Sequence, residues 1–172
     1  DGYIFMGWYE DEEFQTHEIS SLPDGEPRDI EIYARFLQRF TISYNLNGGE
    51  MSFDNEQHFT IEHEFEVPQP EKEGYTFEGW YDNQNFEGEE ITYIELGTDY
   101  DLSLYADWQA VVYSITYDFD GGDEVENFES YTVEDSFELN DTNKEGYDFV
   151  GWYFEDDKVE EIEQGTTGNL EL

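Results

Sequence analysis

The stretch Glu73-Gly-Tyr-Thr-Phe-Glu-Gly-Trp-Tyr81 occurs in three related copies along the chain. The other two copies are Asp1-Gly-Tyr-Ile-Phe-Met-Gly-Trp-Tyr9 and Glu145-Gly-Tyr-Asp-Phe-Val-Gly-Trp-Tyr153, and successive tryptophans lie 72 residues apart. Recurrence at a fixed interval is typical of tandem structural repeats. The stretch therefore predicts a row of similar small domains.

A second block precedes two of these copies. Phe40-Thr-Ile-Ser-Tyr-Asn-Leu-Asn-Gly-Gly49 matches Tyr113-Ser-Ile-Thr-Tyr-Asp-Phe-Asp-Gly-Gly122 at an offset of 73 residues, and no copy precedes the first tryptophan. We therefore divide the chain into the C-terminal half of a repeat (1–36), a complete repeat (37–109) and a nearly complete repeat (110–172) that lacks the end of its last strand.

Alternation of apolar and polar residues predicts most of the strands. It runs through 40–47 and 113–120, where a period of two indicates one buried and one solvated face. The double glycine that ends each block can adopt the positive φ of a tight turn. Similar alternation along 59–67 and 131–139 predicts a second strand in each repeat. Only the stretches after each Trp-Tyr pair, such as 83–94, could hold a short helix.

The first block places Tyr75 and Phe77 on one face of a strand, with Tyr147 and Phe149 in the next copy. The intervening positions vary freely between copies, so we expect the aromatic face to lie in the core. Each repeat is then a small, mostly β (α+β) domain, and rings that bury about 150–250 Å² each compensate for its size. The period exceeds the about 20–50 residues of solenoid repeats, so we expect autonomous domains arranged as beads on a string.

The composition excludes several classes of partner. The 172 residues include 46 Asp or Glu and 6 Lys or Arg, a net charge of −40. Affinity for phosphate depends on clustered Lys and Arg, so we expect no nucleic-acid binding and no basic membrane-binding patch. There is no cysteine, and no apolar run approaches the about 18 residues of a membrane span. We expect no direct membrane insertion, and we expect any export signal or anchor to lie outside these residues.

Two acidic clusters are weak candidates for a divalent cation: Asp118, Asp120 and Asp123 in one, and Glu155, Asp156 and Asp157 in the other. The first does not fit the EF-hand pattern and its counterpart at 45–50 carries Asn residues, so the favoured interpretation is a turn capped by Asx side chains. His58 and His63 would lie on opposite faces of a strand, which argues against a shared zinc ion. We expect no cofactor beyond weak binding of divalent cations.

No arrangement of catalytic residues stands out. Carboxylate pairs can be drawn anywhere among so many acids, so none is informative. The sequence contains no Gly-x-Ser-x-Gly, no phosphate-binding loop and no Cys/His nucleophile pair. We therefore expect no enzymatic activity.

Residues that recur at equivalent positions are expected to maintain the fold. The tryptophans could instead form an exposed aromatic row that binds glycans or proteins, but a residue repeated at one strand position of every unit is more often structural. The recurrent residues are Gly7, Trp8, Gly48, Gly49, Tyr75, Phe77, Gly79, Trp80, Trp108, Gly121, Gly122, Tyr147, Phe149, Gly151 and Trp152.

The ordered blocks carry a resemblance to a known family. The series Ile-Thr/Ser-Tyr-Asn/Asp-Leu/Phe-Asn/Asp-Gly-Gly, Lys-Glu-Gly-Tyr-x-Phe-x-Gly-Trp-Tyr and Gly-Thr-x-x-x-Leu-x-Leu-Tyr-Ala-x-Trp resembles the Listeria/Bacteroides repeat, the family of the internalin B B-repeat. Lys72 and Lys144 occupy its Lys-Glu-Gly position. The resemblance covers essentially the whole chain. This chain departs from the family pattern by its extreme acidity and by ending at Leu172, before the last Tyr-Ala-x-Trp.

The resemblance implies a β-grasp-like (ubiquitin-like) module used in tandem in large bacterial cell-surface or secreted proteins. Members of the family act as spacers and as adhesive or self-associating segments, and no catalytic residue belongs to the motif. We therefore expect an extracellular, non-catalytic spacer or stalk that serves an unidentified protein or cell-surface ligand.

The alternative is an assembly module of an extracellular filament or cell-cell contact. Strands of the half-repeat 1–36 lack their own first half, and unpaired strand edges invite pairing with another chain. The charge fits three interpretations: self-repulsion that keeps a long array soluble and extended, adaptation to a saline habitat, or attraction of a basic partner. We favour the first.

Overall fold

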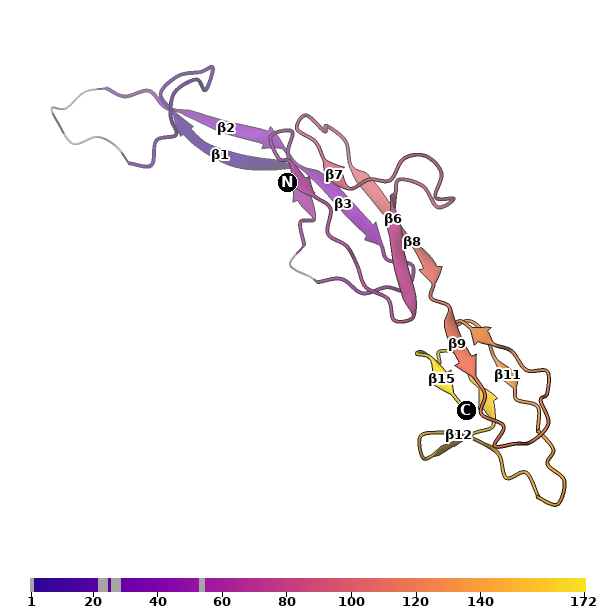
Figure 1. Ribbon diagram of the computed structural model, residues 1–172. Helices are drawn as coiled ribbons and strands as arrows, with labels where there is room; N and C mark the ends of the chain where they lie inside the picture. The colour runs from indigo at the N-terminus through magenta and orange to yellow at the C-terminus, as the bar shows by residue number, and fades with distance from the viewer. Residues whose placement is uncertain (1, 22–24, 26–28, 53–54) are drawn as a thin grey trace. The chain divides into compact units, whose positions relative to one another are not determined.

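The computed structural model describes residues 2–21, 25, 29–52 and 55–172 and contains no helix among them (Figure 1). The described chain is therefore all-β, with tandem repeats. The stretches after each Trp-Tyr pair, which could have held a short helix, contain none in this part of the chain, and the α+β label is not confirmed. In the stretch 83–87, Asn83 Oδ1 accepts the backbone N–H groups of Asn85 and Glu87, each at 3.1 Å. Such bonds give the backbone an alternative to a helix.

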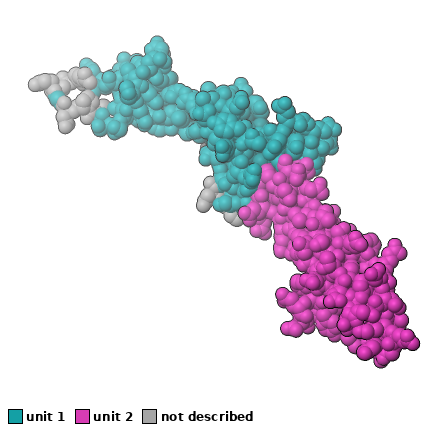
Figure 2. Space-filling view, viewed as in Figure 1, with its two compact units in different colours: residues 1–47, 51–69, 79–106 teal, residues 48–50, 70–78, 107–172 magenta. Residues whose placement is uncertain are grey.

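The residues fall into two compact units, which are coloured in Figure 2. Unit 1 comprises residues 1–47, 51–69 and 79–106, and unit 2 comprises residues 48–50, 70–78 and 107–172. Residues 48–50, 70–78 and 107–109 of the second predicted repeat are thus grouped with the third. The repeat boundaries near residues 36 and 109 remain predictions.

Unit 1 begins with an antiparallel hairpin of β1 (Tyr3–Tyr9) and β2 (Tyr33–Gln38). The following strands are β3 (Phe40–Asn45), β4 (His58–Phe59), β5 (Phe65–Glu66), β6 (Tyr75–Tyr81), β7 (Tyr93–Ile94) and β8 (Leu102–Ala110), and the last residues of β8 and the first of β6 belong to unit 2. A four-stranded sheet has the order β4-β3-β8-β6, and β5 pairs with β7. Strands β3 and β8 are parallel, with Ile42 opposite Leu102.

Unit 2 contains the third repeat. Its strands are β9 (Tyr113–Thr116), β10 (Ser130–Tyr131), β11 (Phe137–Glu138), β12 (Trp152–Phe154), β13 (Asp157–Val159), β14 (Glu161–Ile162) and β15 (Leu170–Glu171). The order is β10-β9-β15 in one sheet, with separate β11-β14 and β12-β13 pairs. Strands β9 and β15 are parallel, with Leu170 opposite Ile115, so the first and last strands of both complete repeats pair in the same way.

The buried apolar residues of each unit come from these strands and the segments beside them. Those of unit 1 are Tyr9, Phe40, Ile42, Phe59, Val67, Trp80, Ile94, Leu102, Leu104 and Ala106. The core cluster of unit 2 consists of Ile115, Tyr131, Leu139, Trp152, Ile162, Leu170 and Leu172. Each core thus contains the tryptophan of the Gly-Trp-Tyr block. The other core residues come from strands that precede and follow this tryptophan in the sequence.

A turn interrupts the strand predicted at 59–67, as it does in the third repeat. Thr60 N–H donates to His63 Nδ1 at 2.9 Å, and His63 N–H returns to the Thr60 carbonyl at 3.0 Å. In the third repeat, Asp135 Oδ2 accepts from the N–H and the hydroxyl of Thr132 at 2.8 and 2.9 Å. Alternation therefore predicted one long strand where side-chain hydrogen bonds close a tight turn.

The expectation that the aromatic face of the first block is buried is wrong for the tyrosine of two copies, whereas Phe149 is partly buried and packs on Trp152. Tyr3 and Tyr147 are 65% and 70% exposed. In the middle copy Tyr75 and Phe77 are half-buried, and the Phe77 ring lies edge-on to Trp108 at 5.4 Å between centroids. Burial of this face depends on whether another ring covers it.

The glycine before each tryptophan has a backbone conformation that disfavours side chains. Gly79 has a φ of 147°, and a Cβ placed on it would lie 2.6 Å from Glu90 Cγ. Gly7 and Gly151 have φ values of 122° and 134°. In the β1–β2 hairpin the register shifts between Phe5 and Gly7, which marks a bulge. The recurrent glycine thus allows the strand to bulge and leaves room for the stem of the opposing side chain.

Gly79→Ala is expected to destabilise the protein more than Gly88→Ala. Both glycines have positive φ, which costs a side chain about 1–3 kcal/mol, but no atom lies within 4 Å of a Cβ at Gly88. The overlap with Glu90 adds to the cost at Gly79 alone. Urea unfolding of the two variants measures the difference, and equal losses of unfolding free energy would contradict the steric role.

Alkaline pH is expected to weaken the fold through Tyr44. Its ring packs on Trp80 at 5.3 Å, its hydroxyl donates to the Glu56 carbonyl at 3.1 Å, and burial, with the Glu56 charge, raises its pKa to about 12. The unfolded chain releases this proton near the ordinary tyrosine pKa of about 10. The contribution of Tyr44 to the free energy of unfolding is therefore complete below pH 10 and is lost as pH rises towards 12.

Tyr44→Phe removes this titration. Between about pH 9 and pH 11.5, the urea midpoint of the variant is expected to fall less than that of the parent protein. Tyr100→Phe, a change at an exposed ring, serves as the control. Parallel curves for the parent and Tyr44→Phe would refute the assignment.

Candidate functional site

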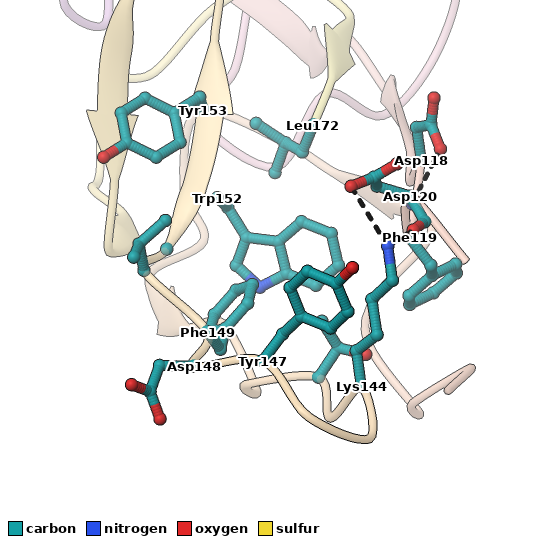
Figure 3. Close-up of a pocket in the computed structure, with 13 residues that line it drawn as sticks. Asp118, Phe119, Asp120, Lys144, Tyr147, Asp148, Phe149, Trp152, Tyr153 and Leu172 are labelled. Atoms are coloured by element: carbon teal, nitrogen blue, oxygen red, sulfur yellow. Dashed lines mark hydrogen bonds and ion pairs between the residues drawn. The ribbon is translucent and has the colours of Figure 1, made fainter. Parts of the chain in front are cut away.

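A cavity of about 300 Å³ lies among recurrent residues of the third repeat in unit 2 (Figure 3). Three sections of the chain meet around it: the loop after β9, the segment that leads into β12, and the end of the chain after β15. Its walls include Asp118, Phe119, Asp120, Lys144, Tyr147, Phe149, Trp152 and Leu172. The cavity therefore combines aromatic rings with one ammonium group and carboxylates.

Lys144 joins two walls of this cavity. Its ammonium group donates to the Asp120 carbonyl, lies 3.4 Å from Asp120 Oδ2, and stands 4.8 Å from the centre of the Tyr147 ring (Figure 3). A carbonyl, a carboxylate and a ring face each attract a cation. Lys144 thus connects the glycine turn at Gly121 to the aromatic segment before β12.

The equivalent lysine of the second repeat has an additional aromatic neighbour. Lys72 Nζ lies 3.8 Å from the Tyr75 ring and 5.8 Å from the Trp108 ring, and Trp108 also packs on Phe77. The printed sequence of the third repeat contains no counterpart of Trp108. Lys144, Tyr147 and Phe149 line the cavity there.

The lining residues do not form a catalytic arrangement. Thr142 is the aliphatic hydroxyl among them, beside the phenols of Tyr147 and Tyr153, and its Oγ1 donates to the Asp123 carbonyl at 2.6 Å. The Asp118 and Asp120 side chains are exposed, and Lys144 already contacts Asp120. The site presents charge and ring surface to solvent, and it holds two segments of the fold together.

The first acidic cluster forms the turn expected from its Asn-containing counterpart. Asp118 Oδ1 accepts the Asp120 N–H at 2.9 Å, as Asn45 Oδ1 accepts the Asn47 N–H at 3.3 Å. Asp123 Oδ2 accepts from Asn143 at 3.3 Å. These carboxylates cap backbone and amide groups.

The second cluster lies in the β12–β13 hairpin. Phe154 is paired with Asp157, so Glu155 and Asp156 form the two-residue turn between them, and all three acids are exposed. Within the described ranges, no group of three or more His, Asp or Glu side chains is arranged to hold a metal ion. Weak, distributed cation binding remains a prediction.

The histidines do not share the strand that the sequence suggested. His58 lies in β4, whereas His63 lies in the following turn and accepts a hydrogen bond from Thr60. This structural use of His63 was missed by sequence reasoning. The pattern Thr-x-x-His, with Thr-x-x-Asp in the next copy, is a signal that could have identified the turn.

The recurrent tryptophans differ in burial. Trp80 and Trp152 are 1% and 4% exposed, and their Nε1–H groups donate to the Pro68 and Asn140 carbonyls at 2.9 and 3.0 Å. Trp8 is 43% exposed.

The recurrent glycines occupy the turns predicted for them. Gly48 and Gly121 have φ values of 87° and 75°, and the lysine of the same repeat lies over each. A Cβ on Gly122 would lie 3.0 Å from the Phe119 carbonyl oxygen, whereas Gly49 is half-buried beside Gly48. The Gly-Gly pair thus provides one residue for the turn and one for close packing.

In the part of the chain that the structure describes, no helix has the length and apolar character needed to cross a membrane. No solved structure matches the chain at a significant level.

Several curated proteins are similar in sequence. A putative Gly-rich membrane protein of Evansella cellulosilytica is 31% identical over 160 residues, which is 89% of this chain and 18% of that protein. A putative membrane protein of the same organism is 31% identical and matches 97% of this chain and 26% of its own length. Internalin H of Listeria monocytogenes is 33% identical over 84 residues, 48% of this chain and 15% of internalin H. The chain thus spans about a quarter or less of each relative.

A family model matches nearly the whole chain in three tandem segments. The matched residues are 1–35, 40–107 and 113–172, and each contains one copy of the Gly-Trp-Tyr block around which the structure is built. The chain therefore belongs to the Listeria-Bacteroides repeat domain family.

Proposed function

We propose that this chain is a non-catalytic spacer or stalk segment of a larger bacterial cell-surface or secreted protein. The observation that carries the proposal is the identical structural use of the indole in both complete repeats. Trp80 and Trp152 fill equivalent cores and donate to equivalent carbonyls. Because these recurrent residues of the repeat are used in folding, copies can be added without changing the module, which suits a protein that sets a distance.

The charge supports the same role. Net charges of −8, −15 and −17 fall in residues 1–36, 37–109 and 110–172, so repulsion acts along the whole array. Like charges within about a Debye length, 8–10 Å at physiological salt, oppose compaction and association. An acidic array of this kind remains soluble and presents other domains away from a surface.

The relatives support a location at the cell surface. Two carry membrane-protein names and one is an internalin, and this chain matches only part of each. An adhesive role, through a protein or cell-surface ligand, is a finer element of the proposal. Nucleic-acid binding, membrane insertion and a resident cofactor are not part of it.

A β-grasp-like arrangement of each repeat also belongs to the proposal. Its support is the parallel pairing of the first and last strands, β3 with β8 and β9 with β15. This pairing brings the two ends of a small domain together in one sheet.

Self-association is the second candidate, and one observation favours it. The β1–β2 hairpin exposes Tyr3, Phe5, Trp8 and Phe36, and it forms a sheet of only two strands. Exposed aromatic surface and free strand edges both favour pairing with another chain.

Sedimentation velocity distinguishes the two candidates. The spacer predicts a monomer at every concentration, whose sedimentation coefficient rises as salt is increased from about 20 to 500 mM because screening allows compaction. Calcium and a chelator are expected to give the same profile. Association that grows with protein concentration would overturn the spacer, and its loss in Trp8→Ser would assign it to the hairpin. Association that requires calcium would overturn the expectation of no cofactor.

A further inference from the structure

Adjacent repeats contact each other through a turn at a fixed position of the later repeat. This turn is Thr132–Asp135 in the third repeat and Thr60–His63 in the second, and the first and last residues are hydrogen-bonded to each other in both. Its carbonyl at the second position accepts a backbone N–H from its own repeat: Gly165 to Val133 at 2.8 Å, and Gly97 to Ile61 at 2.7 Å. These hydrogen bonds therefore fix the backbone conformation of the two central residues of the turn. We call these turns the docking turns.

The docking turn of the third repeat packs against the start of β6. Val133 is 6% exposed, and a Cβ placed on Gly74 would overlap a methyl group of Val133. The φ of Gly74 is +76°, so this position disfavours a side chain for two reasons. The glycine of Lys-Glu-Gly thus brings the backbone of one repeat directly against the apolar residue of the next.

A polar contact accompanies the apolar one. Tyr75 donates its hydroxyl proton to Glu134 Oε1 at 2.9 Å, and this hydrogen bond raises the pKa of Tyr75. The chain between the repeats also returns to the same place, because Val111 N–H donates to the Gly74 carbonyl at 2.9 Å. Three neighbouring contacts thus connect the second repeat, the linker and the third repeat inside unit 2.

Corresponding positions are used in unit 1. Arg39 N–H donates to the Gly2 carbonyl at 2.9 Å, 72 residues before the Val111–Gly74 bond. Glu62, the counterpart of Glu134, forms an ion pair with Arg35 of the first repeat. The linker bond and a contact of the acidic residue of the docking turn therefore recur in both units. The apolar contact is particular to unit 2, because Ile61, the counterpart of Val133, is 42% exposed and no atom lies within 4 Å of a Cβ on Gly2.

We propose that the docking turn is an interaction surface for the preceding repeat, and that it couples the folding of neighbouring repeats. In an array of this kind, stability is the sum of the repeats and of the interfaces between nearest neighbours. Opening of one repeat removes the interface that its neighbour uses. Under this proposal neighbouring repeats support each other, whereas autonomous beads would unfold independently. The coupling does not depend on the spacer function and can be tested without it.

The test is hydrogen exchange, read by mass spectrometry, on the full chain. Ile162 in the third repeat is 1% exposed, so Ile162→Ala leaves a cavity in that core and is expected to accelerate exchange there. With coupling, the amides of β3 and of Leu102–Ala106 in β8, which belong to the second repeat and to unit 1, also exchange about fivefold faster. Unchanged exchange in these strands, with the third repeat opened, would overturn the proposal.

A junction variant then identifies the route. Val133→Asp places a carboxylate against the Gly74 backbone, so amides of the second repeat are expected to exchange faster in this single variant. In the double variant Val133→Asp/Ile162→Ala, exchange in the second repeat is expected to equal that of Val133→Asp alone. If Ile162→Ala accelerates exchange in the second repeat as much in the Val133→Asp background as in the parent protein, the docking turn does not carry the coupling.

Tyr75→Phe gives a milder test with a matched control. It removes only the hydroxyl that binds Glu134, and faster exchange at 70–78 is expected, of about twofold or more. Tyr147→Phe is the same change at the equivalent, exposed position of the third repeat and should leave exchange unaltered. Equal effects of the two changes would overturn the assigned contact.

Discussion

Burial of one indole in each of the second and third repeats is the interaction on which the remaining structure depends. Trp80 lies beneath Tyr44 and donates to the carbonyl of Pro68, so it connects the first strand, the segment after β5 and its own strand. Trp152 makes the corresponding contacts with Tyr117 and Asn140. Modules of about 70 residues without cysteine have a small core, and one large side chain with a satisfied polar group supplies much of it.

The long strands could be predicted from the sequence because their alternation reflects one buried face. Residues 40–45 and 75–81 form strands as expected. The pattern failed at 59–67, since alternation does not reveal that the Thr60 N–H finds a partner in His63. The stretch after Trp80 could have held a helix by its pattern, but the Asn83 side chain binds the backbone N–H groups of the following turn.

The aromatic face and the candidate site show a second limit of sequence reasoning. Tyr75 and Tyr147 occupy equivalent positions, but Tyr75 is half-buried and Tyr147 is 70% exposed. Period alone says which residues share a face and not what covers that face. The Asx turn at Asp118 was predictable because all its partners lie within three residues. The Tyr75–Glu134 contact was not, because it joins residues 59 positions apart in different repeats.

The parallel pairing of the first and last strands determines how each repeat meets mechanical load. Because β3 and β8 are parallel, the N-terminal end of β3 and the C-terminal end of β8 lie at opposite ends of the ladder. Tension along the chain would therefore pull the two strands past each other, and the rungs from Ile42 to Asn45 would be strained together. In a hairpin pulled at its open end, rungs break one at a time. Each complete repeat thus has the shear geometry in which a short ladder resists force best.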